Sequence, residues 1–293
     1  MKPRCAILIA GPTASGKSAL AISLAERHGG VVINADSMQV YRELRILTAR
    51  PTPQDEARVP HKLFGFVPAG EAYSVGRYVV DVAAAIAEAE RDGLLPILVG
   101  GTGLYFKALL EGLSPIPSIP ADVRARWREH AEASGAEALH RVLAERDPEM
   151  ASRLKSGDTQ RVVRALEVLE ATGRSLAEWQ RLPGQGVLSE DETERMVILP
   201  DRAELYRRID ARFDAMMQAG VMDEVAALRT LDLAPDLPVM TAHGVPALTA
   251  ALAGKMDLDE AIAAAKADTR HYAKRQFTWL RRNMIAWKSV VTQ

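Results

Sequence analysis

The 293-residue sequence predicts an α/β fold in which a parallel sheet core is flanked by helices and interrupted by an all-helical insertion domain. Early in the chain, short apolar runs alternate with segments of helical periodicity, a pattern typical of parallel sheets with right-handed crossovers. The proline-punctuated stretch LSPIPSIP (113–120) ends that alternation. The later apolar run RMVILP (195–200) predicts a strand that returns to the sheet.

The elements of the first half follow from apolar patterning. Buried strands are expected over CAILIA (5–10), VVINAD (31–36) and LPILVGG (95–101), because each is a short apolar run bounded by turn residues. Helices are expected over 17–28, which the glycine pair at 29–30 ends, over about 75–91, and from about residue 103. These strands and helices form the predicted sheet core.

The second half is predicted to be mostly helical. Residues 121–180 are rich in Arg and Glu and contain no strand pattern, and further helices are expected over 202–219 and 258–282. We therefore expect a catalytic core formed by residues 1–117 and 197–293, with a helical insertion at 118–196.

Composition narrows the class of protein. Apolar residues make up 48% and charged residues 26% of a chain whose net charge is −1, so any nucleic-acid contact requires locally clustered cations. The single cysteine, Cys5, excludes an internal disulfide, and no apolar run approaches the roughly 20 residues that span a bilayer. We expect a cytoplasmic monomer.

The stretch GPTASGKS (11–18) carries the strongest chemical signal. Gly11, Gly16, Lys17 and Ser18 match the pattern G-x-x-x-x-G-K-[ST], with a strand before it and a helix after it. Backbone N–H groups of such a loop hold phosphate oxygens, the lysine reaches the terminal phosphates, and the hydroxyl holds Mg²⁺. The predicted core is therefore P-loop NTPase-like.

Polar residues follow the next two predicted strands at the same sheet edge. Asp36 ends the second strand and has three possible roles, as a metal ligand, a general base or a helix N-cap. The third strand ends at Gly100, Gly101 and Thr102, where ATPases of this fold usually carry a metal-binding Asp. The glycine pair allows either close backbone approach or a plain turn.

Charge patterning indicates a polyanionic partner. Lys266, Arg270 and Lys274 share one face of the last helix, and aromatic residues are interleaved with further arginines toward its end. Solvated helix faces are the alternative explanation. The six histidines form no zinc-binding pattern, and we assign them no role.

In combination, GPTASGKS, DSMQVY, PILVGGTGLYFKALLEGL, DTQRVVRALEV and KRQFTWLR resemble the tRNA dimethylallyltransferase (tRNA isopentenyltransferase) family, in order and spacing, from about residue 6 to 282. The resemblance implies transfer of a dimethylallyl group from dimethylallyl diphosphate to N6 of the adenine 3′-adjacent to the anticodon. The implied partners are that donor and the anticodon stem-loop of tRNA, and the implied cofactor is Mg²⁺.

The resemblance also implies roles for individual residues. Asp36, Thr102 and Lys17 would be catalytic, and Ser18 would hold the metal ion. The diphosphate would be bound by Gly11, Pro12, Thr13, Ala14, Ser15, Gly16, Lys17 and Ser18. The tRNA would be contacted by Asp36, Ser37, Met38, Gln39, Thr102, Arg124, Gln160, Arg161, Val162, Val163, Arg164, Lys274, Arg275, Gln276 and Arg281.

Three positions depart from the family pattern. Leu47 replaces a glycine, Arg50 replaces a lysine, and Val245 stands where a tyrosine is common. Two other functions would use the same loop, an ATP-dependent small-molecule or nucleoside kinase and an RNA-binding ATPase. The kinase leaves the basic helix unexplained, and the ATPase leaves the polar groups around Asp36 unexplained.

Overall fold

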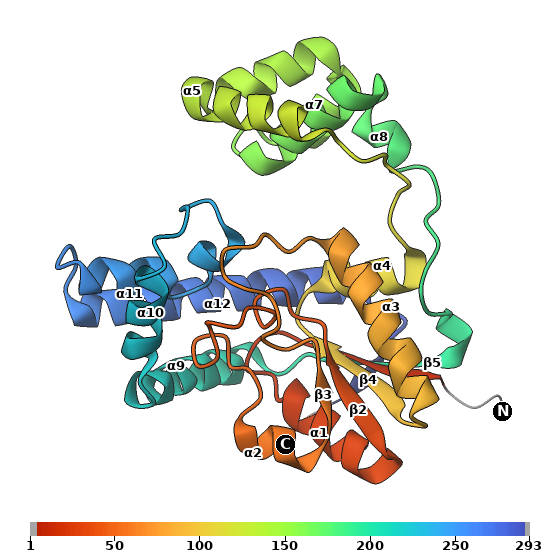
Figure 1. Cartoon of the computed structure of the whole chain (residues 1–293), viewed down its shortest axis with the longest axis vertical. Coiled ribbons are helices and arrows are strands. Elements are labelled where there is room, and N and C mark those ends of the chain that lie inside the picture. Colours follow the sequence, from red (N-terminus) through yellow and green to blue (C-terminus); the bar gives the residue numbers. More distant parts are fainter. Residues whose placement is uncertain (1–4, 291–293) are drawn as a thin grey trace. The chain divides into compact units, whose positions relative to one another are not determined.

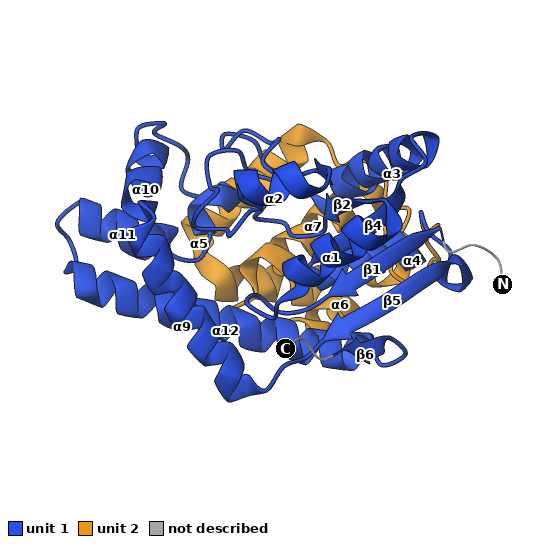
Figure 2. Cartoon of the chain, turned by 90° about the horizontal axis from the view of Figure 1, so that it is seen from below, with its two compact units in different colours: residues 1–110, 187–293 blue, residues 111–186 orange. Residues whose placement is uncertain are grey.

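The computed structural model describes residues 5–290, and the chain divides into two compact units (Figure 2). Unit 1 comprises residues 1–110 and 187–293, and unit 2 comprises residues 111–186. The predicted insertion, 118–196, overlaps most of unit 2 but is placed too late in the chain. Its predicted end falls inside strand β5 (Thr193–Ile198), which is hydrogen-bonded into the sheet of unit 1.

Unit 1 contains a six-stranded, all-parallel sheet with strand order β3-β2-β4-β1-β5-β6. Its strands are β1 (Ala6–Ala10), β2 (Gly30–Asn34), β3 (His61–Lys62), β4 (Leu95–Gly100), β5 (Thr193–Ile198) and β6 (Lys288–Val290). The predicted strands and the parallel sheet are thereby confirmed. Because β2, β4 and β1 are neighbours, their carboxyl ends meet at one edge, where the polar segments of the sequence follow.

Helices cover both faces of this sheet (Figure 1). Alternate residues of β1 point to opposite faces: Ile7 and Ile9 belong to the core beneath α1, whereas Leu8 packs with α3 and α4. The helices of unit 1 are α1 (Lys17–His28), α2 (Pro53–Arg58), α3 (Val75–Arg91), α4 (Gly103–Glu111), α9 (Arg202–Gln218), α10 (Val221–Arg229), α11 (Val245–Leu252) and α12 (Leu258–Asn283), with two short 3₁₀ turns, η1 (Glu190–Glu192) and η2 (Pro238–Thr241).

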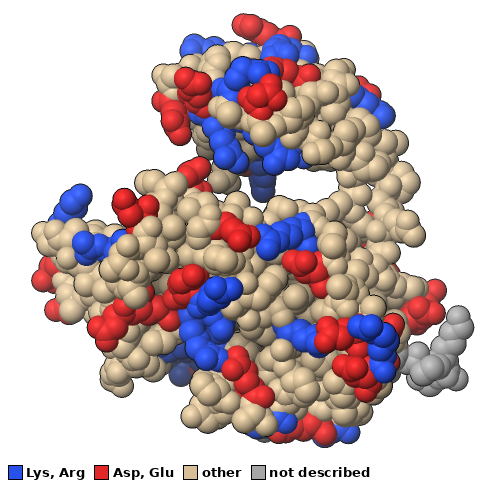
Figure 3. All heavy atoms as spheres, viewed as in Figure 1, with Lys and Arg blue, Asp and Glu red and all other residues tan. Residues whose placement is uncertain are grey.

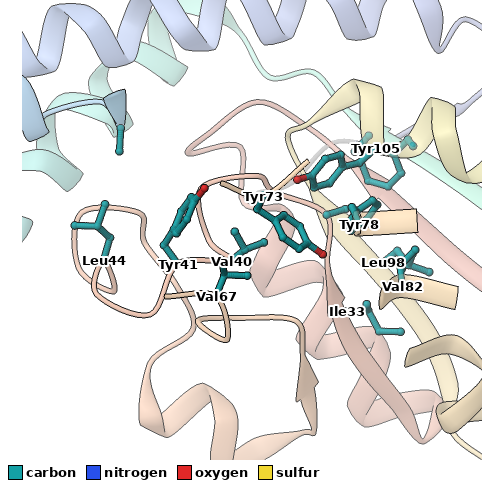
Figure 4. Close-up of a cluster of buried hydrophobic side chains, with 14 of the residues drawn as sticks. Ile33, Val40, Tyr41, Leu44, Val67, Tyr73, Tyr78, Val82, Leu98 and Tyr105 are labelled. Atoms are coloured by element: carbon teal, nitrogen blue, oxygen red, sulfur yellow. The ribbon is translucent and has the colours of Figure 1, made fainter. Parts of the chain in front are cut away.

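A buried aromatic cluster anchors the segment that follows β2 (Figure 4). The rings of Tyr78 on α3 and Tyr105 on α4 stack with their centroids 3.7 Å apart. The Tyr73 hydroxyl donates to Asp81, and Tyr41 is fully buried in the same core. Aromatic side chains bury large apolar areas, so this cluster fixes the loop between β2 and α3 against the sheet.

Unit 2 is entirely helical within its described residues, as predicted. It consists of α5 (Ala121–Arg146), α6 (Pro148–Arg153), α7 (Thr159–Thr172) and α8 (Leu176–Trp179). Gly135 interrupts α5 with a φ of 75°, a left-handed conformation that glycine adopts without strain. Leu139, Leu143 and Leu166 are completely buried, so unit 2 has a core of its own.

Across residues 5–290, the structure contains no helix with both the length and the apolar character required to cross a bilayer.

Candidate active site

The phosphate loop lies between β1 and α1, as its motif predicts. Gly16 adopts a left-handed conformation (φ 86°) at the start of α1, and Ala14 also has a positive φ of 61°. A Cβ atom on Gly11 would lie 2.6 Å from the hydroxyl oxygen of Ser15, so a larger residue there would displace that side chain. The Ser18 hydroxyl belongs to an exposed residue in the first turn of α1. The loop therefore has the strained backbone typical of phosphate-binding loops.

Lys17 is the buried cation of this loop. Its side chain is 8% exposed, and Nζ donates a hydrogen bond to the carbonyl oxygen of Pro12 at 3.2 Å. Burial lowers the pKa of Lys17 to about 8, an effect that Asp36 opposes and Arg212 reinforces. A bound anion would replace the missing solvation and stabilise the charged form of Lys17.

Arg212, on α9, reaches the same loop and was not predicted from the sequence. Its guanidinium donates to the hydroxyl of Thr13 at 2.5 Å. Burial lowers the pKa of Arg212, and the charge of Asp36 opposes that shift. The sequence signal was available, because Arg212 interrupts the apolar stripe formed by Ile209, Phe213 and Met216 on one face of α9. An arginine among buried apolar positions requires an anionic or polar partner.

Asp36 lies beyond the end of β2, where the turn holds it in a defined position. Its backbone N–H donates to Asn34 Oδ1 at 2.8 Å, and its own Oδ1 accepts from the backbone N–H of Met38 at 3.0 Å. No helix begins directly after Asp36, so the interpretation of Asp36 as a helix N-cap is wrong. The second carboxylate oxygen is left to act on other groups in the pocket that Asp36 lines.

Thr102 joins the ends of β2 and β4. The Thr102 hydroxyl oxygen accepts a hydrogen bond from the backbone N–H of Ser37 at 3.0 Å. The backbone N–H of Thr102 donates to the carbonyl of Ala35 at 3.3 Å. Asp36 and Thr102, far apart in sequence, are thus brought to one edge of the sheet.

The glycines around Thr102 do more than form a turn, because they allow other segments of the chain to approach closely. A Cβ atom on Gly100 would lie 2.0 Å from the carbonyl oxygen of Ala35, and on Gly103 it would lie 2.1 Å from the Trp279 ring. On Gly101 it would lie 2.1 Å from Gln276 Nε2. Gly100 therefore admits the neighbouring strand end, and the other two admit α12.

Gln276 departs from the predicted tRNA-binding role. Its side chain is 6% exposed; Oε1 accepts from the backbone N–H of Thr13 at 2.9 Å, and Nε2 donates to the carbonyl of Gly101 at 3.0 Å. Both halves of the amide are used within unit 1. We therefore assign Gln276 to holding the phosphate loop.

An apolar pocket opens beside the loop and Asp36, entirely within unit 1. Polar groups of Thr13, Asp36 and Arg212 lie on its lining, and most of the remaining lining is apolar. The further lining residues are Met38, Leu47, Thr48, Ile209, Phe213, Met216, Ala242, His243, Thr269 and Tyr272. His243, which received no predicted role, lies with its ring centroid 4.5 Å from that of Tyr272. Such a pocket suits a small apolar group attached to a phosphate chain.

Few protein side chains near the loop could bind a metal ion. Residues 5–290 contain no cluster of three or more His, Cys, Asp or Glu side chains that could hold a metal ion. Mg²⁺ often takes only one or two protein ligands and completes its shell with substrate phosphate oxygens and water. The exposed Ser18 hydroxyl beside the loop fits that mode of binding.

The predicted tRNA-contacting segments are only partly accessible. Val162 and Val163 are buried in the core of unit 2, so their side chains cannot reach a ligand. Three of the predicted residues on unit 2 are exposed: Arg124, Gln160 and Arg161. Of these, Arg161 forms an ion pair with Asp158 at 2.8 Å. Arg164 is half-buried and lies 3.4 Å from Glu167.

In the segment after Asp36, some side chains are engaged in hydrogen bonds within the protein and another lines the pocket. Gln39 Nε2 donates to the carbonyls of Thr48 and Ala49, so this amide is engaged within the loop. Ser37 bonds to Thr102, whereas Met38 lines the pocket.

The basic face of α12 is divided in the same way. Lys266 pairs with Asp214, and Arg270 pairs with Asp210, each at 2.5 Å, so these two cations hold α12 to α9. Lys274, Arg275 and Arg281 are exposed. The outer face of α12 carries a groove lined by His271, Lys274, Arg275, Thr278, Trp279, Arg282 and Asn283. Basic and acidic side chains are interspersed elsewhere on the face shown in Figure 3.

The departures from the family pattern have structural explanations. Leu47 is 8% exposed and lines the pocket, and Val245 is 1% exposed in the core at the start of α11. Arg50 donates to the carbonyls of Tyr41 and Arg42 at 3.1 and 3.0 Å. Both hydrogen bonds leave one guanidinium nitrogen, Nη1, so Arg50 holds this loop through a single donor atom.

Family models and similar proteins of known function point to the same family. The sequence model of the IPP transferase family matches residues 39–283, and that of isopentenyl transferases matches residues 5–59. The tRNA dimethylallyltransferase of Nitrobacter hamburgensis is 60% identical over 97% of this chain and 90% of its own length. That of Methylobacterium radiotolerans is 58% identical over 97% of this chain and 92% of its own.

Solved structures agree. The tRNA isopentenylpyrophosphate transferase of Bacillus halodurans is 34% identical, with a TM-score of 0.69, over 97% of this chain and 88% of that one. A eukaryotic dimethylallyltransferase acting on tRNA is 30% identical, with a TM-score of 0.80, over 96% of this chain and 71% of that one.

A phosphate loop between the first strand and the first helix of a parallel sheet places the chain in the P-loop fold class, and here the loop adjoins an apolar pocket and a carboxylate. More specifically, the chain belongs to the IPP transferase family, and its enzymatic activity is that of a tRNA dimethylallyltransferase.

Proposed function

We propose that the donor is dimethylallyl diphosphate, with its diphosphate on residues 11–18 and its alkyl group in the apolar pocket. The acceptor is N6 of the adenine 3′-adjacent to the anticodon of a tRNA. The observation that carries this proposal is the lining of the pocket, where Thr13 and Arg212 mark a phosphate end, apolar side chains form a wall, and Asp36 is present.

Binding of the diphosphate uses two converging cations. Lys17 and Arg212 are both desolvated, and Asp36 is the nearby anion that acts on both of their pKa values. A diphosphate brings more negative charge than Asp36 supplies, so it is attracted strongly in this buried site. As the allylic C–O bond breaks, the electron pair leaves with the diphosphate, and these cations stabilise that charge.

Ser18 is the residue that would hold Mg²⁺, together with the diphosphate oxygens. The ion would neutralise charge on the leaving group.

The acceptor nitrogen is prepared by Asp36 and Thr102. The adenine lies in a single-stranded loop and flips into a site at the cost of a few kcal/mol of unstacking. A carboxylate oxygen of Asp36 accepts a hydrogen bond from N6 and takes its proton as the C–N bond forms. Thr102, tied to Ser37, orients the groups at this edge.

Recognition of tRNA rests on the accessible members of the predicted set. On α12 these are Lys274, Arg275 and Arg281, and the groove beside them exposes an aromatic ring, Trp279. On unit 2, Arg124, Gln160 and Arg161 are exposed and Arg164 is half-buried. Cations contact the phosphates, and the aromatic ring offers a surface on which a base stacks. We propose that the enzyme acts as a cytoplasmic monomer.

A label-transfer assay tests the function. Purified protein, Mg²⁺ and an unmodified anticodon stem-loop are incubated with dimethylallyl diphosphate labelled in the prenyl group or with ATP labelled in the γ-phosphate. Label on the RNA from the prenyl donor alone is the expected result. Loss of label from ATP without any prenyl transfer would favour the kinase instead.

A further inference from the structure

The apolar pocket has a defined direction. Arg212 marks its phosphate end through the bond to Thr13. Met216 lies one turn farther along α9, about 6 Å along the helix axis, and also lines the pocket. If the diphosphate lies on the loop, the alkyl chain of the donor extends from Arg212 toward Met216.

Leu47 lines the apolar part of the same pocket. It is 8% exposed and belongs to the same buried cluster as Phe213 and Met216. A Cβ atom on Gly244 would lie 2.9 Å from Leu47 Cδ1 and 3.5 Å from the Phe213 ring, so these two side chains converge beside Gly244. Leu47 is therefore backed by Gly244 and Phe213 and has little room to move away from a longer ligand.

The backbone of Leu47 is also fixed. The carboxylate of Glu224, on α10, accepts from the backbone N–H groups of Arg45, Ile46 and Leu47 at 2.7, 2.7 and 2.8 Å. Hydrogen bonds to a carboxylate are stronger than neutral ones, and three on one group define the conformation of the segment. Glu224 is thus a positioning residue for Leu47.

We infer that Leu47 is the specificity-determining residue for the length of the prenyl donor. Its side chain narrows the apolar part of the pocket, so that a dimethylallyl group fits and a donor longer by one isoprene unit does not. This inference rests on the proposed placement of dimethylallyl diphosphate. The reaction is the same for either donor: the allylic C–O bond breaks, the N6–C bond forms, the diphosphate leaves, and the proton of N6 passes to Asp36.

The test measures kcat/KM for dimethylallyl diphosphate and geranyl diphosphate, with Mg²⁺ and an anticodon stem-loop, in the wild-type protein, Leu47→Ala and Leu47→Val. We expect the wild type to favour the shorter donor. We expect Leu47→Ala to raise the geranyl-to-dimethylallyl ratio by about 10-fold or more, and Leu47→Val by less, since each methylene in an apolar pocket changes discrimination by roughly 10–200-fold.

The matched control is Leu44→Ala, the same truncation in the same segment. Leu44 is fully buried but does not line the pocket, so its variant should lose stability without changing the ratio. A ratio unchanged in both Leu47 variants, or equal use of both donors by the wild type, would overturn the inference. If the wild type transferred neither prenyl group, the proposed function itself would fail.

Discussion

The side-chain oxygen of Gln276 accepts a hydrogen bond from the backbone N–H of Thr13, a residue 263 positions earlier in the chain. Its amide nitrogen donates to Gly101 at the end of β4. One buried side chain on α12 therefore holds the phosphate loop and the neighbouring strand end in register.

Replacing Gln276 with Ala should impair donor binding rather than tRNA binding. Loss of both hydrogen bonds frees the loop, so we expect the KM for dimethylallyl diphosphate to rise about 10-fold, equivalent to about 1.4 kcal/mol. Steady-state kinetics with each substrate varied in turn separate the two effects. A rise confined to the KM for tRNA would restore the tRNA-binding role predicted from the sequence.

Arg212→Ala should weaken stabilisation of the departing diphosphate. We expect kcat/KM for the donor to fall by about 10²–10³, the range found when a charge-stabilising donor is removed. Arg208→Ala is the matched control, because Arg208 lies on the same helix and pairs with Glu204. Equal losses in both variants would indicate damage to α9 instead of a role at the site.

Asp36→Asn keeps the size of the side chain and removes its basicity. We expect the single-turnover rate of prenyl transfer to fall by about 10²–10⁴, with donor affinity nearly unchanged. Rapid quenching at saturating donor and RNA measures that rate. A variant with the wild-type rate would show that no proton acceptor is required at this position.

Lys17 should give the donor reaction a dependence on pH. Its pKa in the folded protein is about 8, below the ordinary value of 10.5, so the free enzyme loses this charge as pH rises through 8. We expect kcat/KM for the donor to decline above that pH. Because kcat/KM reports groups of the free enzyme, kcat should decline only at higher pH.

The same shift predicts that Lys17→Met stabilises the protein without ligand. Below pH 8 the folded state carries a buried charge at a cost of roughly 3 kcal/mol. Between pH 8 and 10.5 the unfolded state binds more protons than the folded state, so wild-type stability rises with pH there. Thermal unfolding at pH 7 should show a higher Tm for the variant, which should also be inactive. A lower Tm would contradict the assignment of Lys17 as a destabilising cation.

The two groups of cations on α12 should differ in their effect on RNA. Lys274→Ala combined with Arg275→Ala should weaken stem-loop binding and reduce its dependence on salt. Lys266→Ala combined with Arg270→Ala removes the same charge but breaks the ion pairs with α9. We expect this double variant to lower Tm and to weaken stem-loop binding less than the first one does. Binding isotherms at several salt concentrations test both double variants.

Much of the fold could be predicted from local patterns. The helices over 17–28 and 75–91 match α1 and α3, because their apolar periodicity coincides with capping residues. Strands β3 and β6 were missed, since two or three partly exposed residues carry no periodic signal.

The site was predictable only where local sequence carries the chemistry. The phosphate loop, Asp36 and Thr102 follow strands that could be recognised. Gln276 and Arg212 act through contacts with Thr13, and helical spacing alone does not show which partner a side chain meets. The paired state of Lys266 and Arg270 depends in the same way on the packing of α9 against α12.

The contact of Gly103 with the Trp279 ring has a consequence for synthesis of the protein. During translation the phosphate loop emerges early, whereas α12, which packs on Gly103 and bonds to Thr13, emerges more than 200 residues later. A ribosome-bound chain that lacks α12 should therefore have a formed strand and helix on either side of the loop but no working donor site. Prenyl transfer should begin only after α12 has left the ribosome, and stalled chains of increasing length would show activity appearing in one step.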